Sequence, residues 1–204
     1  MKELISHVVL LNRVTSQFDD AEVYRELDQK NLDDFERHWR PEFARMASSF
    51  TSSADRSAAH AEDSHWDWVR LATLARQRLG QETFAVECQG VTQGLMLLDF
   101  TLFARLPEQM GRELIYVDRL ATAPWNRKKF TDNPRYKGVG RVLFATALSA
   151  SIEEGFEGRL GLHSLPQAIT WYQAEIGMAD LGLDVIKNMN YYEVTKAQTD
   201  AFLA

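Results

Sequence analysis

The stretch RYKGVG, residues 135–140, runs directly into a helix-forming segment that starts at Arg141 and continues to residue 154. Two glycines spaced by one residue open this helix, and without side chains they allow a ligand to approach the backbone closely. The first N–H groups of a helix have no partner inside it, and the helix dipole places partial positive charge there. Lys137 and Arg141 add positive charge beside the turn. The stretch therefore predicts a site for a phosphate or pyrophosphate group.

The spacing of the glycines discriminates between known phosphate-binding motifs. The dinucleotide fingerprint G-x-G-x-x-G requires a third glycine, which the residues after Gly140 do not supply. The P-loop fails because Arg141 follows Gly140 where a lysine is needed. The pattern R/Q-x-x-G-x-G/A is filled by Arg135, Gly138 and Gly140. In this pattern the chain resembles the GNAT superfamily of N-acetyltransferases, where it is the pyrophosphate-binding signature.

The resemblance extends over residues 81–195. The apolar segment 114–124 resembles the fourth strand of the family, and the segment 158–164 resembles its fifth strand. The segment 167–178 resembles the family's helix with the pattern A-x-x-x-Y. The resemblance implies an α/β (α+β) fold with a mixed, mostly antiparallel central sheet. Its fourth and fifth strands are splayed and flanked by helices, with extra helices at the N-terminal end. We expect one domain, 1–204, with residues 1–80 on the acceptor side and 81–204 as the acetyl-CoA-binding core.

The sequence departs from the family pattern at two points. Ten residues, 125–134, separate Pro124 from Arg135, where the family has only a few. Tyr172 lies five residues before Gly177, whereas four is the commoner spacing.

Composition sets broad limits on the function. The 204 residues suffice for one well-packed domain, and 45% hydrophobic and 25% charged residues are ordinary values for a globular protein. The net charge of −6 argues against a nucleic-acid partner. We expect no membrane span and no metal site, because neither long apolar runs nor ligand spacings occur. We expect no secretory signal, because the first residues include an early acidic residue and no small-residue cleavage site. One cysteine, Cys88, excludes an internal disulfide, so the chain is expected to be cytoplasmic.

Local patterns predict the secondary structure. Residues 4–11 read as a buried first strand, and a helix is expected after Asp19 and Asp20. Asn31 is a candidate N-cap for the next helix, which Pro41 should break or restart. Further helices are expected over 64–79 and 138–154. Strands are expected over 83–88 and 95–101, joined by a turn over 90–94, and at 114, at 159, over 181–185 and over 190–194. Thr195 and Gln198 form a capping box for a last helix.

The resemblance also implies how a donor would be held. Backbone N–H groups of Gly138, Val139, Gly140 and Arg141 would bind the pyrophosphate of acetyl-CoA, with Arg135 and Lys137 beside them. The backbone of Leu120, Ala121 and Thr122 would bind the pantetheine arm between the splayed strands. Pro124 cannot donate a hydrogen bond, which helps the strand to part from its neighbour.

Two side chains are candidates for proton transfer. By resemblance, Tyr172 would donate a proton to the departing thiolate; the alternative is an interior aromatic residue. Asp118 lies on the fourth strand, where a carboxylate would accept the proton of the amine; the alternative is a salt bridge with Arg119 or another base. Asp99 and Glu113 are weaker alternatives. Ser164 ends the fifth strand near the expected thioester, or else caps the following helix.

The sequence therefore predicts an acetyl-CoA-dependent N-acetyltransferase that works by direct attack of a primary amine in a ternary complex. The first alternative is a noncatalytic acyl-CoA-binding sensor or interaction module. The second is a nucleotide-dependent enzyme that uses the same glycines. The acceptor could be a small molecule or a peptide amine, and homodimers are common in the superfamily.

Overall fold

The computed structural model describes residues 2–48, 51–52, 54 and 61–204. In these residues nine strands form one sheet in the order β6-β1-β2-β3-β4-β5-β7-β9-β8. The pairing is parallel between β5 and β7 and antiparallel in β1–β2, β1–β6, β2–β3, β7–β9 and β8–β9. The strands are β1 Glu3–Asn12, β2 Gln17–Arg25, β3 Gln81–Cys88, β4 Val91–Phe103, β5 Glu113–Thr122, β6 Tyr136–Lys137, β7 Leu160–His163, β8 Ala179–Asp184 and β9 Met189–Val194. This mixed, mostly antiparallel sheet flanked by helices confirms the predicted fold class.

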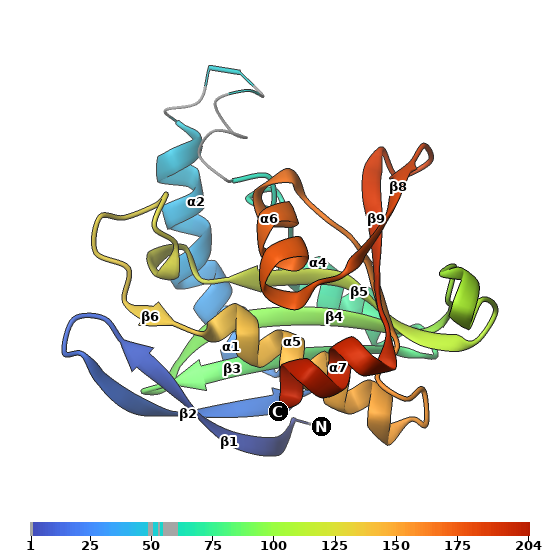
Figure 1. The fold of residues 1–204 in the computed structure, drawn as a ribbon. Coiled ribbons are helices and arrows are strands. Elements are labelled where there is room, and N and C mark those ends of the chain that lie inside the picture. Colours follow the sequence, from blue (N-terminus) through green and yellow to red (C-terminus); the bar gives the residue numbers. More distant parts are fainter. Residues whose placement is uncertain (1, 49–50, 53, 55–60) are drawn as a thin grey trace. The chain divides into compact units, whose positions relative to one another are not determined.

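The helices include regular, 3-10 and π-helical segments; the α-helices are labelled in Figure 1. The α-helices are α1 Gln29–Asp34, α2 Arg40–Ala47, α4 Trp68–Ala75, α5 Val139–Glu153, α6 Ile169–Trp171 and α7 Lys196–Leu203. The π-helical turns are η1 Phe35–Trp39 and η5 Tyr172–Ile176, and the 3-10 turns are η2 Pro107–Gln109, η3 Pro124–Asn126 and η4 Pro166–Ala168. As predicted, Thr195 caps α7 in a capping box with Gln198.

The chain divides into two compact units, which are described separately. The first comprises Met1–Leu97 and Arg119–Leu143, and the second comprises Leu98–Asp118 and Phe144–Ala204. The single domain 1–204 stays a prediction.

A strand stands where the sequence predicted a first helix. Residues Gln17–Arg25 form β2, which pairs with β1 in a hairpin (Figure 1, blue) and with β3 on its other side. Ala21 and Val23 are buried while Glu22 and Tyr24 are less so, which is the period of two expected for a strand. Pairing on both edges overrides the helical pattern. The prediction of a buried first strand was also wrong, because most residues of β1 are exposed or half-buried and Val9 is 53% exposed.

The next helices begin and end differently from the prediction. Asp28, not Asn31, is the N-cap of α1, and Asn31 completes its capping box. The helical path then continues through η1, where the N–H of Arg40 donates to the carbonyl of Phe35. Pro41 lies at the start of α2, where the missing N–H of proline is tolerated. Helix α4 is shorter than expected and is capped by Asp67, whose side chain accepts from the N–H of Arg70 at 3.0 Å.

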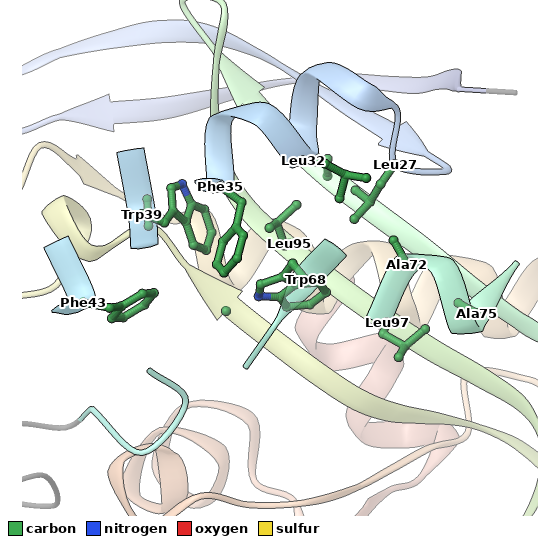
Figure 2. Packing of buried hydrophobic residues seen from close by; sticks show 13 residues of the cluster. Leu27, Leu32, Phe35, Trp39, Phe43, Trp68, Ala72, Ala75, Leu95 and Leu97 are labelled. Atoms are coloured by element: carbon green, nitrogen blue, oxygen red, sulfur yellow. The ribbon is translucent and has the colours of Figure 1, made fainter. Parts of the chain in front are cut away.

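These helices pack their apolar faces on one cluster of the first unit (Figure 2). Trp39 and Trp68 are at most 1% exposed, and the indole N–H of Trp39 donates to the carbonyl of Thr92 at 3.1 Å. The buried members are Leu27, Leu32, Phe35, Trp39, Phe43, Trp68, Ala72, Ala75, Ala85, Leu95, Leu97, Ala121 and Ala123. Because Ala121 and Ala123 belong to this cluster, the core fixes the position of the end of β5.

The turn between β3 and β4 is tighter than the predicted 90–94. Gln89 and Gly90 form it with positive φ values of 49° and 70°, and Gly94 lies inside β4. A Cβ atom on Gly94 would lie 2.6 Å from Cγ1 of Val139 and 2.9 Å from Cδ1 of Leu143. The first turns of α5 therefore rest on the β4 backbone at a distance that only glycine permits.

Cys88, which precedes this turn, is buried. Its thiol lies 3.3 Å from the carbonyl oxygen of Asp20 and can donate to it. Burial raises the pKa of the thiol above its ordinary value.

The second unit is held around the carboxylate of Glu193 on β9, which is fully buried. It accepts from the backbone N–H groups of Arg105 and Leu106 and from the amide of Gln109, the latter two at 2.9 and 3.0 Å. These bonds tie the connection between β4 and β5 to β9. Beside it, β5 and β7 pair in parallel from Ile115↔Leu160 to Val117↔Leu162.

The contact at Gly94 can be tested by one methyl group. We expect Gly94→Ala to lower the free energy of unfolding by about 1–3 kcal/mol, because the added Cβ overlaps Val139 and Leu143. Urea denaturation measures this change. In the matched control, Gly140→Ala in α5, the Cβ has room, and the variant should be at least as stable as the parent, by up to about 1 kcal/mol. Equal stability of Gly94→Ala and the parent would contradict the close packing.

Candidate functional site

The glycine turn before α5 lies at the end of a short strand. β6 pairs with the end of β1 through Asn12↔Tyr136 and Leu11↔Lys137. Gly138 follows with φ +106°, a backbone conformation that favours glycine. Its carbonyl accepts the N–H of Val142 at 2.9 Å. The amides of Val139 and Gly140 precede this bond and therefore have no partner within the helix, which leaves them oriented for an anion.

The space around Gly140 is the most informative feature of the turn. A Cβ there would lie 3.8 Å from Cγ2 of Thr122, an ordinary contact, and the φ of Gly140 is not positive. Neither packing nor backbone conformation demands glycine at this position, although glycine is a poor helix residue. Gly94, Gly158 and Gly161, in contrast, are each required by a neighbour closer than 3.0 Å. A bare backbone at Gly140 fits the close approach of a pyrophosphate.

The charged residues around the turn differ in the contacts that their side chains make. Lys137 and Arg141 are exposed. Arg135 is exposed as well, but its guanidinium donates to the side-chain carbonyl of Gln89 at 3.0 Å and lies over the ring of Tyr136. Its backbone N–H and carbonyl are bonded to Trp125 and Arg13. In this structure Arg135 fixes the approach to the turn, and a contact of its side chain with a ligand stays a prediction.

The end of β5 carries the three residues predicted to hold the pantetheine arm. Ala121 is buried in the core, while Leu120 and Thr122 are half-buried. The carbonyl of Thr122 already accepts from Nε and a terminal nitrogen of Arg127, at 2.9 and 2.6 Å. A ligand contact at Thr122 would therefore have to use another group of that residue. The N–H of Ala123 donates to the carbonyl of Gln93 at 2.9 Å, which keeps the strand end tied to β4.

Arg127 has a role that the sequence did not reveal. It belongs to the basic run 127–129 of the insertion that precedes Arg135. Its guanidinium forms a two-pronged ion pair with Asp63 at 2.7 and 2.6 Å and lies over the rings of Phe43 and Phe130. Asp63 is 3% exposed. The inserted segment 125–134 is thus fastened both to the end of β5 and to Asp63.

Tyr172, the predicted proton donor, lies in the second unit. It is 7% exposed and contacts the rings of Phe144 and Trp171, with centroid distances of 6.0 and 5.1 Å. Burial raises the pKa of its phenol, so it carries its proton at neutral pH. Tyr172 begins the π-helical turn η5, in which the N–H of Gly177 donates to the carbonyl of Tyr172. A π-turn accommodates one extra residue, which explains the unusual spacing of Tyr172 and Gly177.

The other two predicted residues of this unit lie at the ends of strands. Asp118 is half-buried and directly follows Val117, the last residue of β5 in register with β7. Ser164 follows β7 and is buried, and its hydroxyl donates to the carbonyl of Leu165 at 2.9 Å. The alternative that Ser164 caps the next helix was wrong, because Leu165 holds that position without a side-chain bond.

A group of side chains that the sequence did not connect lies beside them. The hydroxyl of Tyr116 is 2.8 Å from Nδ1 of His163, and Nε2 of His163 is 3.1 Å from a carboxylate oxygen of Asp184. Arg105 donates to the same carboxylate oxygen at 2.8 Å. Residues on β5, β7 and β8 thus meet in one line, which only the sheet order brings together.

Two kinds of feature are absent from the described residues. In 2–48, 51–52, 54 and 61–204, no three His, Cys, Asp or Glu side chains are grouped so that they could hold a metal ion. Over the same part of the chain, no helix is both long and apolar enough to span a membrane.

Comparisons with known proteins show the fold. No family model matches the sequence, and no curated protein matches it. The structure is similar to PaiA N-acetyltransferase from Thermoplasma acidophilum, solved in complex with coenzyme A, with 14% identity, a TM-score of 0.51 and 85% and 97% of the two chains covered.

Two further solved structures agree. FeeM, an N-acyl amino acid synthase from uncultured soil microbes, has a TM-score of 0.54 at 12% identity and covers 89% and 93% of the chains. A putative GNAT-family acetyltransferase from Desulfovibrio desulfuricans has a TM-score of 0.52 at 13% identity, over 86% and 99%. The resemblance to the GNAT superfamily, first seen in the sequence, thus extends to the fold.

The ion pair of Asp63 and Arg127 generates a stability prediction. Arg127→Met removes the charge that faces a buried carboxylate, so the free energy of unfolding should fall by about 3 kcal/mol. Urea denaturation of this variant, of Asp63→Asn and of the double variant gives the coupling energy. The double variant should lose clearly less than the sum of the single changes. Strict additivity of the two losses would contradict the pair.

Proposed function

We propose that the chain is an acyl-CoA-dependent N-acyltransferase that moves an acetyl group from acetyl-CoA to a primary amine by direct attack. The observation that carries the proposal is the turn that opens α5, where Gly138 has φ +106° and the N–H groups of Val139 and Gly140 precede the first helical hydrogen bond. These N–H groups belong to the residues at which the R/Q-x-x-G-x-G/A pattern implies pyrophosphate binding. The fold shared with N-acetyltransferases supports the same assignment.

The residues of the turn fit the binding of coenzyme A. Val139 and Gly140 offer backbone N–H groups to the diphosphate, and the exposed cations Lys137 and Arg141 can approach its oxygens. The amides of Leu120 and Ala121 are the proposed contacts of the pantetheine arm. One of them would also stabilise the charge that develops on the acetyl carbonyl oxygen. When bound, acetyl-CoA supplies the activated acetyl group.

Two further groups complete the proposed chemistry. Tyr172, protonated because burial raises its pKa, donates a proton to the departing sulfur. Asp118 on β5 is the carboxylate that the sequence indicates as acceptor of the amine proton. The small-molecule or peptide amine acceptor stays a prediction, and so does the homodimer.

A change at Gly140 separates ligand binding from folding. In Gly140→Asp the carboxylate lies in the first turn of α5, where the helix dipole favours it, so stability should be kept. The same charge repels a diphosphate, so the increase in melting temperature that coenzyme A gives the parent should disappear. Thermal-shift measurements with coenzyme A, ATP and NAD test this.

Gly140→Ala is the control for that experiment, because the motif accepts alanine there and the Cβ has room. It should retain stabilisation by coenzyme A. A Gly140→Asp protein that binds coenzyme A as well as the parent refutes the site. Stabilisation by ATP or NAD instead of coenzyme A would favour the nucleotide-dependent alternative.

Tyr172→Phe tests the proton donor. The substitution keeps the ring that packs on Phe144 and removes only the hydroxyl. We expect kcat to fall on the order of 10²-fold while the affinity for coenzyme A is unchanged. Steady-state kinetics over an amine library, with release of the coenzyme A thiol as readout, measures it. A parent that binds coenzyme A tightly but acetylates no amine would favour the noncatalytic sensor.

A further inference from the structure

The line of Tyr116, His163 and Asp184 in the second unit is a hydrogen-bonded path through the interior. The side chain of His163 is 2% exposed, that of Asp184 13%, and Tyr116 as a residue 7%. The imidazole is also held between rings, with centroid distances of 5.7 Å to Tyr116 and 4.9 Å to Tyr191. Buried polar groups with such fixed partners have a defined direction of hydrogen bonding.

That direction follows from Asp184. Its carboxylate accepts from Arg105, from His163, and from the backbone N–H groups of Ile186 and Lys187, at 3.0 and 3.3 Å. The bonds from Arg105 and His163 keep the pKa of Asp184 well below its ordinary value, so it is ionised. An ionised carboxylate only accepts, so Nε2 of His163 carries a proton.

The protonation of the other ring nitrogen follows in turn. Burial lowers the pKa of His163, with Arg105 and Lys187 contributing in the same direction and Asp184 opposing them. Near neutral pH the imidazole is therefore uncharged, and Nδ1 has a lone pair. The hydroxyl of Tyr116 must then donate to Nδ1. The three groups are arranged like a catalytic triad of nucleophile, base and carboxylate, with the phenol of Tyr116 in the position of the nucleophile.

The position of the line connects it to the proposed reaction. Tyr116 directly precedes Val117, and His163 directly follows Leu162; Val117 and Leu162 are the last residue pair in the parallel register of β5 and β7. By resemblance, the acetyl group is transferred near this end of the two strands. Tyr116 also shares a face of β5 with Asp118, the predicted base, because side chains alternate along a strand.

We propose that Tyr116, in place of the predicted Asp118, accepts the proton of the attacking amine, with His163 and Asp184 as positioning residues that act through it. The proposal rests on the proposed function. As the amine nitrogen bonds to the acetyl carbon and the C–S bond breaks, one N–H proton moves to the oxygen of Tyr116. The phenol proton moves to Nδ1 of His163, and Asp184 stabilises the resulting imidazolium. The sulfur takes its proton from Tyr172, so the products are the amide and the free thiol. The His163 imidazolium then releases its extra proton to water, and the Tyr172 phenolate takes a proton back.

The direction of the hydrogen bonds can be tested without turnover. Nitrogen-15 NMR of the histidine rings, with His163→Gln for assignment, should show His163 neutral near pH 7 with its proton on Nε2. In Asp184→Asn, the oxygen that holds the turn amides is kept, and an N–H group replaces the oxygen facing Nε2. The tautomer should then reverse to Nδ1–H, because Nε2 must now accept.

Kinetics test the role of the line. Tyr116→Phe, His163→Gln and Asp184→Asn should each lower kcat on the order of 10²-fold, with the KM for the amine changed by no more than about threefold. The rise of kcat/KM with pH that reflects deprotonation of the amine itself is common to all variants. The parent should show a further acidic limb at lower pH as His163 loses its proton, and this limb should be absent in His163→Gln. Tyr191→Phe is the control, because it keeps the ring against His163 and removes a hydroxyl outside the line; its pH profile should match the parent.

Each result bears on the proposal. A charged His163 at pH 7, an Nδ1–H tautomer in the parent, or an unchanged tautomer in Asp184→Asn overturns it whether or not an acceptor amine is known. So does Tyr116→Phe with parental kcat, or a further acidic limb that persists in His163→Gln, which would return the role to a group such as Asp118. Failure of coenzyme A to stabilise the parent would instead refute the proposed function and leave the hydrogen-bond direction intact.

Discussion

The close approach of α5 to β4 at Gly94 is the constraint on which the candidate site depends. With no side chain at Gly94, Val139 and Leu143 press against the strand backbone. This contact fixes the distance of the first turn of α5 from β4, and it thereby fixes the position of the amides of Val139 and Gly140. The end of β1 holds β6 from the other side, and Thr122 borders Gly140. An anion site made of backbone groups needs such support, because those groups can be positioned only by moving the whole segment.

The sequence was sufficient for the parts that are encoded locally or by a motif. The glycine turn, α5, the strand pair β5 and β7, and the capping box at Thr195 were predicted because each has its own pattern of glycines, apolar residues or caps. The N-terminal part was predicted less well. Residues 17–25 carry a pattern compatible with a helix, and only pairing with both β1 and β3 makes them a strand. The turn at Gln89 and Gly90 was placed too late, because Gly94 looked like a turn residue and is a packing residue.

The site residues likewise separate into those that a motif predicts and those whose contacts depend on tertiary structure. The backbone donors follow from a motif, whereas the partners of Thr122 do not. Arg127 lies in an insertion, and Asp63 is 64 residues away in the sequence, so their ion pair depends on tertiary structure. Asp184 and His163 are similarly brought together only by the order of β7, β9 and β8. The spacing of Tyr172 and Gly177 departed from the family pattern, and the π-turn shows that one extra residue was absorbed locally.

The state of Cys88 has a practical consequence for enzymology on this protein. A thiol reacts as its thiolate, and burial both shields this sulfur and disfavours its ionised form. Cys88 is also the sole cysteine of the chain. Disulfide exchange dyes that report free coenzyme A should therefore give a low and steady protein background, even at high enzyme concentration. Slow acetylation of poor acceptors then becomes measurable by continuous absorbance, without a cysteine-free variant.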